Sequence, residues 1–542
     1  MSKRIVTVFS IFCVLMCLLN IRVADLTSSP ELKETAQNQR SYTLTAGKAR
    51  GKIYDHKFTP LVGNTAKTFT AVLPQAETAA ALLEEVDDSR RQELYQLLQG
   101  GTPFLTDLLS GEDYDLDGVT SVEVPQRYSA GQLAAHVIGY VNSDGAGVTG
   151  IEKAYDELLS SAGEQVEVHY SLDGLGQLLG DGSSAVTTTG DGDSGVVLTL
   201  DRELQSICEN VGERYINKGA IVIMDPSTGK LLACASFPSY APDNVAKSLT
   251  DERGPLLNRC FTAFPVGSTF KVTLASAALD MGMDAGAAYD CTGWIDVSGQ
   301  PFKCHLLSGH GVIDMKKAMV ESCNTYFINL GGQLGAEKIV DYAQNLGFGR
   351  QTELAPGLTS AAGLLPKASE LPNPADVANL SFGQGRLLAT PVQLCQMVAA
   401  VVNGGKTPIP QLVEGTTADG VTLNSEIPSA APIYAMSETT AGILREFLES
   451  AVEQKDNMMA KPTLVTAAGK TATAQTGSFD ENGEEILDVW FAGYFPAENP
   501  KYVVSVMVEH GRTGNLSAGP VFAKIADQIT LLDEIRAEQA KH

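Results

Sequence analysis

A serine and a lysine three residues apart are the pair in this sequence best suited to carry out chemistry. Ser268 and Lys271 lie in the segment FPVGSTFK, residues 264–271. A serine hydroxyl is a weak nucleophile until a base removes its proton, and a desolvated lysine with a lowered pKa can act as that base without histidine. The pair is therefore typical of the serine–lysine form of acyl-transfer catalysis.

The residues after Ser268 predict the element that positions it. Phe270, Leu274 and Ala278 repeat at helical spacing, and Gly282 is a suitable end for the helix. Ser268 then lies at the helix N-terminus, where free backbone N–H groups and the helix dipole favour negative charge. Lys271 lies one turn further along the same face. The alternative for Ser268 is a plain capping serine.

A second serine–lysine pair in the chain serves as a comparison. Ser227 and Lys230 have the same spacing, but they lie in the stretch DPSTGK, residues 225–230. Asp, Pro, Ser and Gly at this density are typical of a turn between two strands, where the two side chains need not converge. We therefore predict a structural turn at Ser227.

Two further polar motifs follow Ser268 in order. The only S-x-N sequence in the chain is SCN at 322–324, and its alternative interpretation is a helix boundary. The sequence KTAT at 470–473 precedes two predicted antiparallel strands, at 489–495 and 502–508. Three polar motifs in this order are far more specific than the serine–lysine pair alone.

With these three elements assembled, the chain resembles a class B penicillin-binding protein, a membrane-anchored D,D-transpeptidase that crosslinks peptidoglycan. The resemblance covers nearly the whole length, because further segments are similar to that family's motifs: RGKIYD at 50–55, GVTGIE at 147–152, LTLDRELQ at 198–205, LNR at 257–259, SFGQG at 381–385 and WFAG at 490–493. It implies an α+β penicillin-binding transpeptidase fold, a mixed domain with an antiparallel sheet flanked by helices. An elongated N-terminal pedestal domain and a single N-terminal transmembrane helix would precede it.

The domain boundaries come partly from the residues themselves. Glycine recurs between 174 and 195, which is typical of loops at a boundary. Strands predicted near both ends of 196–535, with helices between them, favour an α+β domain whose sheet is assembled from distant parts of the chain. Together with the resemblance, this predicts a cytoplasmic tip and transmembrane anchor at 1–24, a non-catalytic, dimerisation-like pedestal at 25–195, a transpeptidase domain at 196–535 and a tail at 536–542.

The resemblance implies a role for each residue of the first two motifs. Ser268 would attack the penultimate D-Ala carbonyl of a stem peptide ending in D-Ala-D-Ala, releasing the terminal D-Ala and leaving an acyl-enzyme. Lys271 would take the hydroxyl proton, and Ser322 would pass a proton to the leaving amine. Asn324 would orient Lys271 and bond the substrate amide. An amine of a second stem peptide would then accept the acyl group.

The third motif would bind the substrate. Lys470 and Thr471 would hold the terminal carboxylate, an anion that needs a cation and a hydroxyl donor. The backbone N–H groups of Ser268 and Thr473 would form the oxyanion hole, worth about 3 kcal/mol per donor. The resemblance further implies acylation of Ser268 by β-lactams and a membrane glycosyltransferase as a partner. It implies no metal and no cofactor.

Two segments depart from the family's pattern. Ala472 stands where the family usually has glycine, and we expect its methyl group to crowd ligand approach to the strand or alter its twist. β-Lactams would then acylate the Ala472→Gly variant faster. After Asp55 the chain has His56, Lys57 and Phe58, where the family commonly has Arg-Asn-Gly, so we expect a weakened turn.

The first 25 residues determine the expected location of the protein. Lys3 and Arg4 precede an apolar run at 5–19, which residues 20–23 can extend toward the length that spans a bilayer. No small-x-small cleavage site follows it. We predict an uncleaved, single-pass membrane anchor with its basic end in the cytoplasm and the bulk of the chain outside. A cleaved signal peptide and a buried core helix are the alternatives.

The composition excludes one class of partner. The chain has 542 residues and a net charge of −25, which repels phosphate backbones, so we expect no nucleic acid as a partner.

Nine cysteines are present, and no Cys/His spacing suggests zinc. Cys291 and Cys304 could form a disulfide or remain buried thiols.

Two other functions share parts of this pattern. A β-lactamase or β-lactam sensor would use the same acylation, but a β-lactamase needs a base that activates water. No Glu-x-x-Leu-Asn sequence lies between Asn324 and Lys470 to supply that base. A non-catalytic scaffold of the cell-wall synthesis machinery would fit if Ala472 marks lost activity. The three motifs together favour the transpeptidase.

Overall fold

The computed structural model describes residues 2–29, 41–109, 114, 116–173, 176–179, 184–190 and 192–541. The chain divides into two compact units that alternate along the sequence. The sequence predicts a single domain boundary near residue 195, with all earlier residues outside the transpeptidase domain. In the structure, two earlier segments, 51–62 and 128–161, fold with the larger unit instead. The smaller unit comprises Met1–Arg50, Gly63–Arg127 and Ala162–Gly192, and the larger comprises Gly51–Val62, Tyr128–Ser161 and Asp193–His542.

The smaller unit holds two three-stranded antiparallel sheets. The first is ordered β1 (Ser41–Lys48), β7 (Gln165–Ser171), β8 (Ser184–Thr189), and the second β5 (Phe104–Thr106), β4 (Thr65–Val72), β6 (Val119–Gln126). Val122 and Tyr170 lie in a core that the two sheets share. A separate core joins the second sheet to α3 (Ala76–Glu84) and α4 (Asp88–Gln99) through Leu82 and Leu94. The role of this unit as a non-catalytic pedestal stays a prediction.

The first helix of the chain, α1, spans Ser2–Ser28 and exposes its apolar side chains. Its stretch Lys3–Ser28 is long enough to cross a membrane and contains an 18-residue window with a mean hydropathy of 2.2, and it is the one such helix among the described residues. The helix thus continues four residues beyond the predicted anchor, which ends at residue 24.

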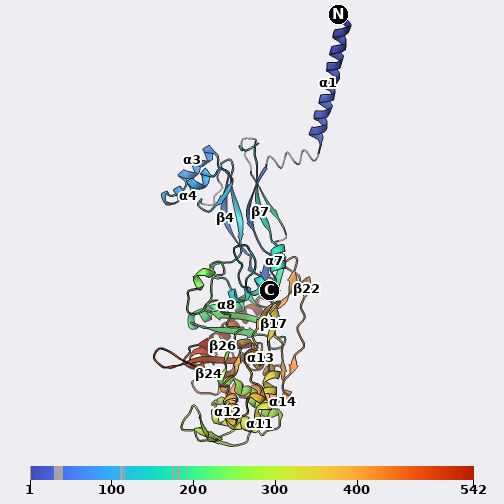
Figure 1. Ribbon diagram of the computed structural model, residues 1–542. Coiled ribbons are helices and arrows are strands. Elements are labelled where there is room, and N and C mark those ends of the chain that lie inside the picture. The colour runs from blue at the N-terminus through green and yellow to red at the C-terminus, as the bar shows by residue number, and fades with distance from the viewer. Residues whose placement is uncertain are drawn as a thin grey trace. The chain divides into compact units, whose positions relative to one another are not determined.

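A five-stranded antiparallel sheet is the main sheet of the larger unit (Figure 1). Its order is β11 (Leu231–Phe237), β10 (Gly219–Met224), β26 (Tyr502–Glu509), β25 (Glu485–Phe495), β24 (Ala468–Phe479). The predicted pairing of 489–495 with 502–508 is confirmed. So is the assembly of the sheet from distant parts of the chain, because β10 pairs with β26. The KTAT sequence lies on β24, at an edge of the sheet.

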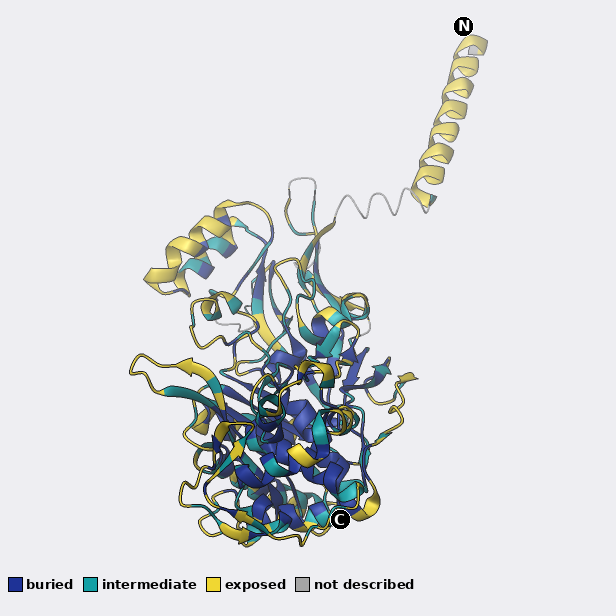
Figure 2. Cartoon of the chain, turned by 60° about the horizontal axis from the view of Figure 1, so that its bottom comes forward, coloured by how far each residue is buried: buried dark blue, intermediate teal, exposed yellow. Residues whose placement is uncertain are grey.

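Helices cover this sheet on both faces, because alternate residues of its strands enter different cores. Ile221 and Phe491 enter a core with α8 and α15, whereas Val222 and Trp490 enter a larger core that includes α9, α11, α13 and α14. Figure 2 shows the buried residues of both cores in dark blue. These helices are α8 (Arg202–Tyr215), α9 (Lys271–Asp280), α11 (Asn324–Asn345), α13 (Pro391–Val402), α14 (Glu438–Glu453) and α15 (Gly519–Gln539).

A second sheet brings the early part of the chain into the larger unit. Its order is β22 (Ser425–Glu426), β21 (Val413–Thr417), β9 (Gly195–Leu198), β2 (Lys52–Tyr54), β3 (Pro60–Val62), and β2 runs parallel to β9. The unit also contains α5 (Ala135–Ile138), α6 (Gly150–Ala154), α7 (Asp156–Ser161), η1 (Val245–Ser248), β12 (Phe264–Pro265), η2 (Gly267–Phe270), β13 (Tyr289–Cys291), β14 (Trp294–Val297), β15 (Gln300–Lys303), β16 (Gly311–Ile313), α10 (Met315–Val320), β17 (Thr352–Ala355), β18 (Leu358–Ser360), η3 (Ala368–Glu370), α12 (Pro374–Ser381), β19 (Leu388–Ala389), β20 (Lys406–Thr407), β23 (Ile433–Tyr434) and η4 (Gly514–Ala518).

The C-terminal helix continues past residue 535, where the sequence predicts a tail. Arg536 donates hydrogen bonds at 2.8 Å to both carboxylate oxygens of Asp201. Asp201 also caps α8 by accepting from the backbone N–H groups of Glu203 and Leu204. Residues as far as Gln539 are therefore part of the folded unit.

The turn after β2 is well formed, contrary to the weakened turn expected from its sequence. Oδ1 of the buried Asp55 accepts hydrogen bonds from the backbone N–H groups of Lys57 at 2.9 Å and Thr59 at 2.8 Å. Phe58 adopts a φ of 59°, the left-handed conformation that glycine usually supplies. The contacts of Asp55 thus fix the turn without glycine.

Removing this carboxylate should destabilise the larger unit. Besides the turn, Asp55 Oδ2 accepts from the backbone N–H of Arg202 at 3.2 Å. Asp55→Ala leaves these donors unpaired where Asp55 is buried, and we expect a loss of about 2–4 kcal/mol in the free energy of unfolding, measured by urea denaturation.

The matched control for this variant is Asp480→Ala. Asp480 also accepts two backbone N–H groups, those of Asn482 and Glu484, but it is exposed, so water can replace it. We expect a loss below about 1 kcal/mol for the control. Equal losses in the two variants would contradict the role given to Asp55.

Candidate active site

Ser268 lies at the start of a helix, as the sequence predicts. It belongs to η2, which leads directly into α9, and Gly282 follows the end of α9 with a φ of 76°. Ser268 is half-buried, and its hydroxyl forms no hydrogen bond within the described part of the chain. The hydroxyl is therefore available to react.

Two glycines allow the backbone at Ser268 to approach its neighbours closely. The N–H of Gly267 donates to the carbonyl oxygen of Gly383 at 3.0 Å, which joins the SFGQG segment to the start of the helix. A Cβ on Gly383 would lie 1.9 Å from Gly267 O. A Cβ on Gly267 would lie 3.1 Å from the carbonyl oxygen of Thr473. Ser268 is thus held beside the edge strand β24.

Lys271 links Ser268's helix to the S-x-N motif. Its side chain is fully buried, and Nζ donates to Ser322 O at 2.7 Å, to Ser322 Oγ at 3.2 Å and to Asn324 Oδ1 at 2.7 Å. Burial, which disfavours the charged form, lowers the pKa of Lys271 to about 7. No hydrogen bond joins Lys271 Nζ to Ser268 Oγ in the described structure, and such bonds are often long before substrate binds.

The S-x-N motif lies at the junction of α10 and α11, so the helix boundary and the polar site are both present. Asn324 is the first residue of α11. Ser322 adopts a φ of 57°, which is uncommon for a residue with a side chain and is found where the surroundings impose it. In this conformation both the carbonyl and the hydroxyl of Ser322 accept hydrogen bonds from Lys271.

Lys470 is the second buried lysine of the site. It is 3% exposed, and its Nζ donates to Thr471 O at 3.1 Å. Burial lowers the pKa of Lys470 well below its usual value, and the positive charges of Lys271 and Lys455 lower it further. Neither Lys470 nor Lys271 has an ion-pair partner among the described residues. Two buried amines without acidic partners make a site that favours an anion.

The threonines of the third motif lie on the other face of β24. Successive side chains of a strand point to opposite faces, so Lys470 is buried while Thr471 and Thr473 are half-buried. Thr473 Oγ1 accepts from the backbone N–H of Gly514 at 3.2 Å. The joint binding of a carboxylate by Lys470 and Thr471 therefore stays a prediction.

Ala472 does not occupy the position that the sequence analysis gives it. Its side chain is 3% exposed and belongs to the same core as Trp490, its partner on β25. The methyl group therefore packs into the protein interior, and no observation supports its crowding a ligand. The alternative effect, an altered twist of β24, is untouched by this burial, so the faster acylation expected for Ala472→Gly stays a prediction.

Trp490 connects the sheet to the segment before Ser268. Its indole Nε1–H donates to the carbonyl oxygen of Pro265 at 2.8 Å, and its ring contacts that of Phe264 edge-on.

The comparison pair, Ser227 and Lys230, does not form a site like that of Ser268 and Lys271. Ser227 Oγ donates to Asp225 Oδ1 at 2.6 Å, and Lys230 Nζ pairs with Glu414 at 2.7 Å. The predicted structural turn at Ser227 is confirmed.

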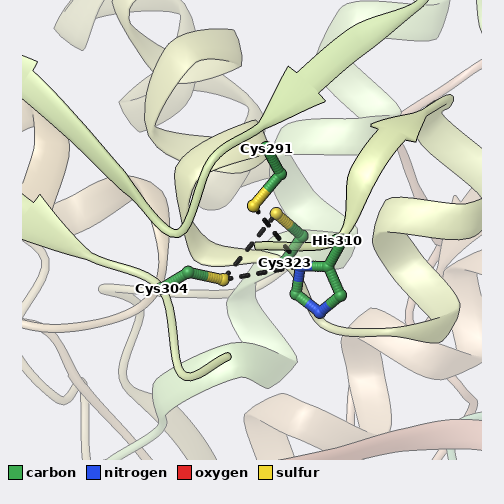
Figure 3. Close-up of side chains that lie close together, drawn as sticks. All are labelled: Cys291, Cys304, His310 and Cys323. Carbon is green, nitrogen blue, oxygen red and sulfur yellow. Dashed lines mark hydrogen bonds between the residues drawn. The ribbon is translucent and has the colours of Figure 1, made fainter. Parts of the chain in front are cut away.

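One group of side chains that could hold a metal ion was missed by the sequence analysis (Figure 3). Cys291, Cys304, His310 and Cys323 lie together beside the S-x-N turn. Their spacing along the chain matches no common zinc pattern, and Cys323 is hidden inside the S-x-N motif. All nine cysteines are free, so Cys291 and Cys304 do not form a disulfide.

Known families provide an independent comparison. The family model described as "Penicillin binding protein transpeptidase domain" matches residues 219–527. Stage V sporulation protein D of Bacillus subtilis (strain 168) is 31% identical over 433 residues, which cover 77% of this chain and 65% of that protein. The chain thus spans just under two thirds of that relative. Peptidoglycan D,D-transpeptidase MrdA of Acinetobacter baumannii is 28% identical over 554 residues, covering 88% of this chain and 80% of that protein.

Solved structures confirm the fold predicted from the sequence. A structure described as a complex between penicillin-binding protein PBP2 and MreC from Helicobacter pylori matches with a TM-score of 0.65 and 24% identity. The match covers 91% of this chain and 99% of that one. The α+β arrangement, with an antiparallel sheet between helices, is therefore the transpeptidase fold of these proteins.

The buried amine of Lys470 should lower the stability of the protein. We expect Lys470→Met, which keeps the length of the side chain, to raise the free energy of unfolding at pH 7 by about 1–3 kcal/mol. At neutral pH the amine of Lys470 binds a proton more readily in the unfolded chain than in the folded protein, which favours unfolding. This loss of stability disappears as pH rises toward the ordinary lysine pKa of 10.5, where the unfolded chain also gives up the proton. The gain in the variant should shrink over the same range, as urea unfolding at several pH values measures.

Lys455→Met is the control for this prediction. Lys455 is more exposed and pairs with Glu321, so its replacement should bring no gain in stability. A destabilised Lys470→Met variant would show that Lys470 is satisfied by contacts within the protein.

Proposed function

The chain belongs to the class B penicillin-binding proteins, the family of peptidoglycan D,D-transpeptidases, and we propose that it crosslinks stem peptides through an acyl-enzyme on Ser268. The observation that carries the proposal is the buried amine of Lys271. It lies one helical turn from Ser268 and donates hydrogen bonds to both polar residues of the S-x-N motif. A lysine with a pKa of about 7 can accept a proton at neutral pH.

The first half of the reaction forms the ester. Ser268 Oγ attacks the carbonyl carbon of the penultimate D-Ala, and its proton passes to neutral Lys271. The carbonyl oxygen becomes an anion, which the backbone N–H groups of Ser268 and Thr473 stabilise by about 3 kcal/mol each. The close approach of Gly267 to Thr473 O supports this pairing of donors.

The second half of the step expels the terminal D-Ala. The bond between the carbonyl carbon and the amide nitrogen breaks, and the leaving amine takes a proton from Lys271 by way of Ser322. Ser322 Oγ lies 3.2 Å from Lys271 Nζ, within reach of such a transfer. Asn324 keeps Lys271 in place through its hydrogen bond of 2.7 Å. An amine of a second stem peptide then attacks the ester, and Ser268 regains its proton.

Lys470 supplies the charge that recognises the substrate. A stem peptide ends in a carboxylate, and the buried amines of Lys470 and Lys271 have no acidic partner among the described residues. In the free protein, burial lowers the pKa of Lys470. The incoming carboxylate favours the charged form of this lysine. Thr471 adds a hydroxyl donor. β-Lactams carry a carboxylate next to a strained amide and acylate Ser268 by the same route.

The location follows from α1. We assign this helix as an uncleaved, single-pass anchor, with the basic residues Lys3 and Arg4 in the cytoplasm and the bulk of the chain outside. One structural relative is described in complex with MreC. A membrane glycosyltransferase, which supplies the glycan strands to be crosslinked, is the partner that we expect for this chain.

Covalent labelling by a fluorescent penicillin tests the central proposal. We expect Ser268→Ala to lose labelling completely, because no other described serine lies one turn from a buried lysine that bonds the S-x-N motif. Ser227→Ala should label like the unchanged protein, since Ser227 belongs to the turn made by Asp225. Peptide mapping of the label identifies the acylated residue.

The fate of the ester separates the proposed activity from its alternatives. A long-lived adduct on Ser268, together with transfer of a stem peptide to an added amine, supports the transpeptidase. Rapid turnover of a chromogenic β-lactam would indicate a hydrolase instead. Crosslinking in cells that is unchanged by Ser268→Ala would favour the scaffold.

The rate of acylation should depend on pH through Lys271. Because the neutral amine is the base and burial lowers its pKa to about 7, the rate constant should fall below that pH, approaching tenfold per unit. Stopped-flow measurement with a chromogenic cephalosporin between pH 5.5 and about 8.5 gives the profile. A flat profile, with the protein still folded by circular dichroism, would exclude Lys271 as the base.

A further inference from the structure

Three thiols and one imidazole meet beside the S-x-N turn (Figure 3). Each side chain offers one ligand atom, and these atoms all lie within 4.8 Å of one another. The four residues come from separate points of the larger unit: Cys291 ends β13, Cys304 follows β15, His310 precedes β16 and Cys323 caps α11.

The distances within this group fit a tetrahedral ion. Zinc binds sulfur at about 2.3 Å and imidazole nitrogen at about 2.0–2.1 Å, so a tetrahedron has edges of about 3.8 Å between sulfurs and about 3.6 Å between sulfur and nitrogen. Cys304 Sγ lies 3.9 Å from Cys323 Sγ. His310 Nδ1 lies 3.4 Å from Cys291 Sγ and 3.6 Å from Cys304 Sγ.

The backbone brings these side chains together by a close crossing of two loops. Cys291 pairs with Gly311 in the antiparallel ladder of β13 and β16, which places His310 beside it. A Cβ on Gly309 would lie 2.1 Å from the carbonyl oxygen of Cys291, so only glycine fits there, and its φ is 78°. Such tight construction keeps the three thiols buried and leaves His310 partly accessible.

A neighbouring hydroxyl supports one of the sulfurs. Thr325 Oγ1 donates a hydrogen bond to Cys291 Sγ at 3.1 Å, and Thr325 is itself fully buried. Donors of this kind stabilise the negative charge of a metal-bound thiolate and fix its orientation.

We propose that these four side chains bind one structural zinc ion, through Sγ of Cys291, Cys304 and Cys323 and Nδ1 of His310. Three thiolates and an imidazole are a common ligand set for structural zinc, and soft sulfur ligands disfavour magnesium and calcium. Four protein ligands leave no open position, so the ion positions the chain and does not react. A disulfide would use only two of the three thiols and would leave the imidazole unexplained.

The ion acts on the active site through Cys323. This residue lies between Ser322 and Asn324, the two residues that accept hydrogen bonds from Lys271. A metal bond at Cys323 Sγ therefore fixes the turn in which Ser322 holds its uncommon φ of 57°. Loss of the ion should loosen this turn and displace the acceptors of Lys271.

Metal analysis of the full-length protein, purified in detergent without chelators, tests the site. We expect inductively coupled plasma mass spectrometry to find close to one zinc ion per chain. Cobalt exchanged for zinc should give the thiolate charge-transfer and d–d absorption bands of a tetrahedral sulfur-rich site. Removal of zinc by a strong chelator should lower the melting temperature, and added zinc should restore it.

Two histidine variants make the test specific. His310→Ala should lose most of the zinc, whereas His310→Cys should retain it because a thiolate replaces the imidazole. His305→Ala is the matched control, since its ring lies only 5.2 Å from that of His310 but is not one of the four ligands. It should retain the zinc and the cobalt spectrum.

Several results would overturn the proposal. One is a zinc content far below one per chain that added zinc does not raise. Another is a stoichiometric content of copper or iron in place of zinc. A disulfide found between any two of the three cysteines, or zinc lost in His305→Ala and kept in His310→Ala, would also overturn it.

The link to the active site has its own readout. The chelated protein should be acylated by a fluorescent penicillin at least tenfold more slowly than the zinc-loaded protein, and added zinc should restore the rate. The Ser268→Ala variant should still bind one zinc, so that the metal site is tested independently of the proposed acylation. Equal acylation rates with and without zinc would refute the link.

Discussion

The burial of one amine is the constraint on which the active site depends. Lys271 is removed from water, so its Nζ needs acceptors that the protein itself must supply, and an unpaired buried amine is costly. Ser322, in the turn before α11, and Asn324, the first residue of α11, supply them from a point more than fifty residues later in the chain. The larger core on this side of the main sheet keeps the water out. The same burial that lowers the stability of the protein lowers the pKa of the lysine.

The parts of this site that depend on local sequence could be predicted. The helix after Ser268 follows from apolar spacing, and the turn at Ser227 follows from its Asp, Pro and Gly. The order of the three motifs indicated the family and the fold, and the hairpin of β25 and β26 followed from two apolar runs around a proline. In each case the residues that decide the structure are neighbours along the chain or belong to a recognised motif.

The parts that depend on distant contacts could not be predicted. Residues 51–62 join the larger unit only because β2 pairs with β9, and no local pattern indicates a parallel partner so far along the chain. The turn at Phe58 forms without glycine because Asp55 accepts two backbone N–H groups. The methyl group of Ala472 turned out to be buried because Trp490 lies opposite it. The four metal-binding side chains meet through a crossing of loops that their spacing does not reveal.

The order of strands in the main sheet has a consequence for how the protein is made. The hairpin of β10 and β11 leaves the ribosome early, yet its neighbour β26 is synthesised almost last. Contacts between residues so far apart in the sequence form slowly, because the chain between them loses entropy as the loop closes, before the contacts stabilise the structure. The nascent chain must therefore wait, with the second edge of β10 unpaired, until nearly every residue has been added. Protection of this edge from aggregation during that interval is a requirement that this topology places on the cell.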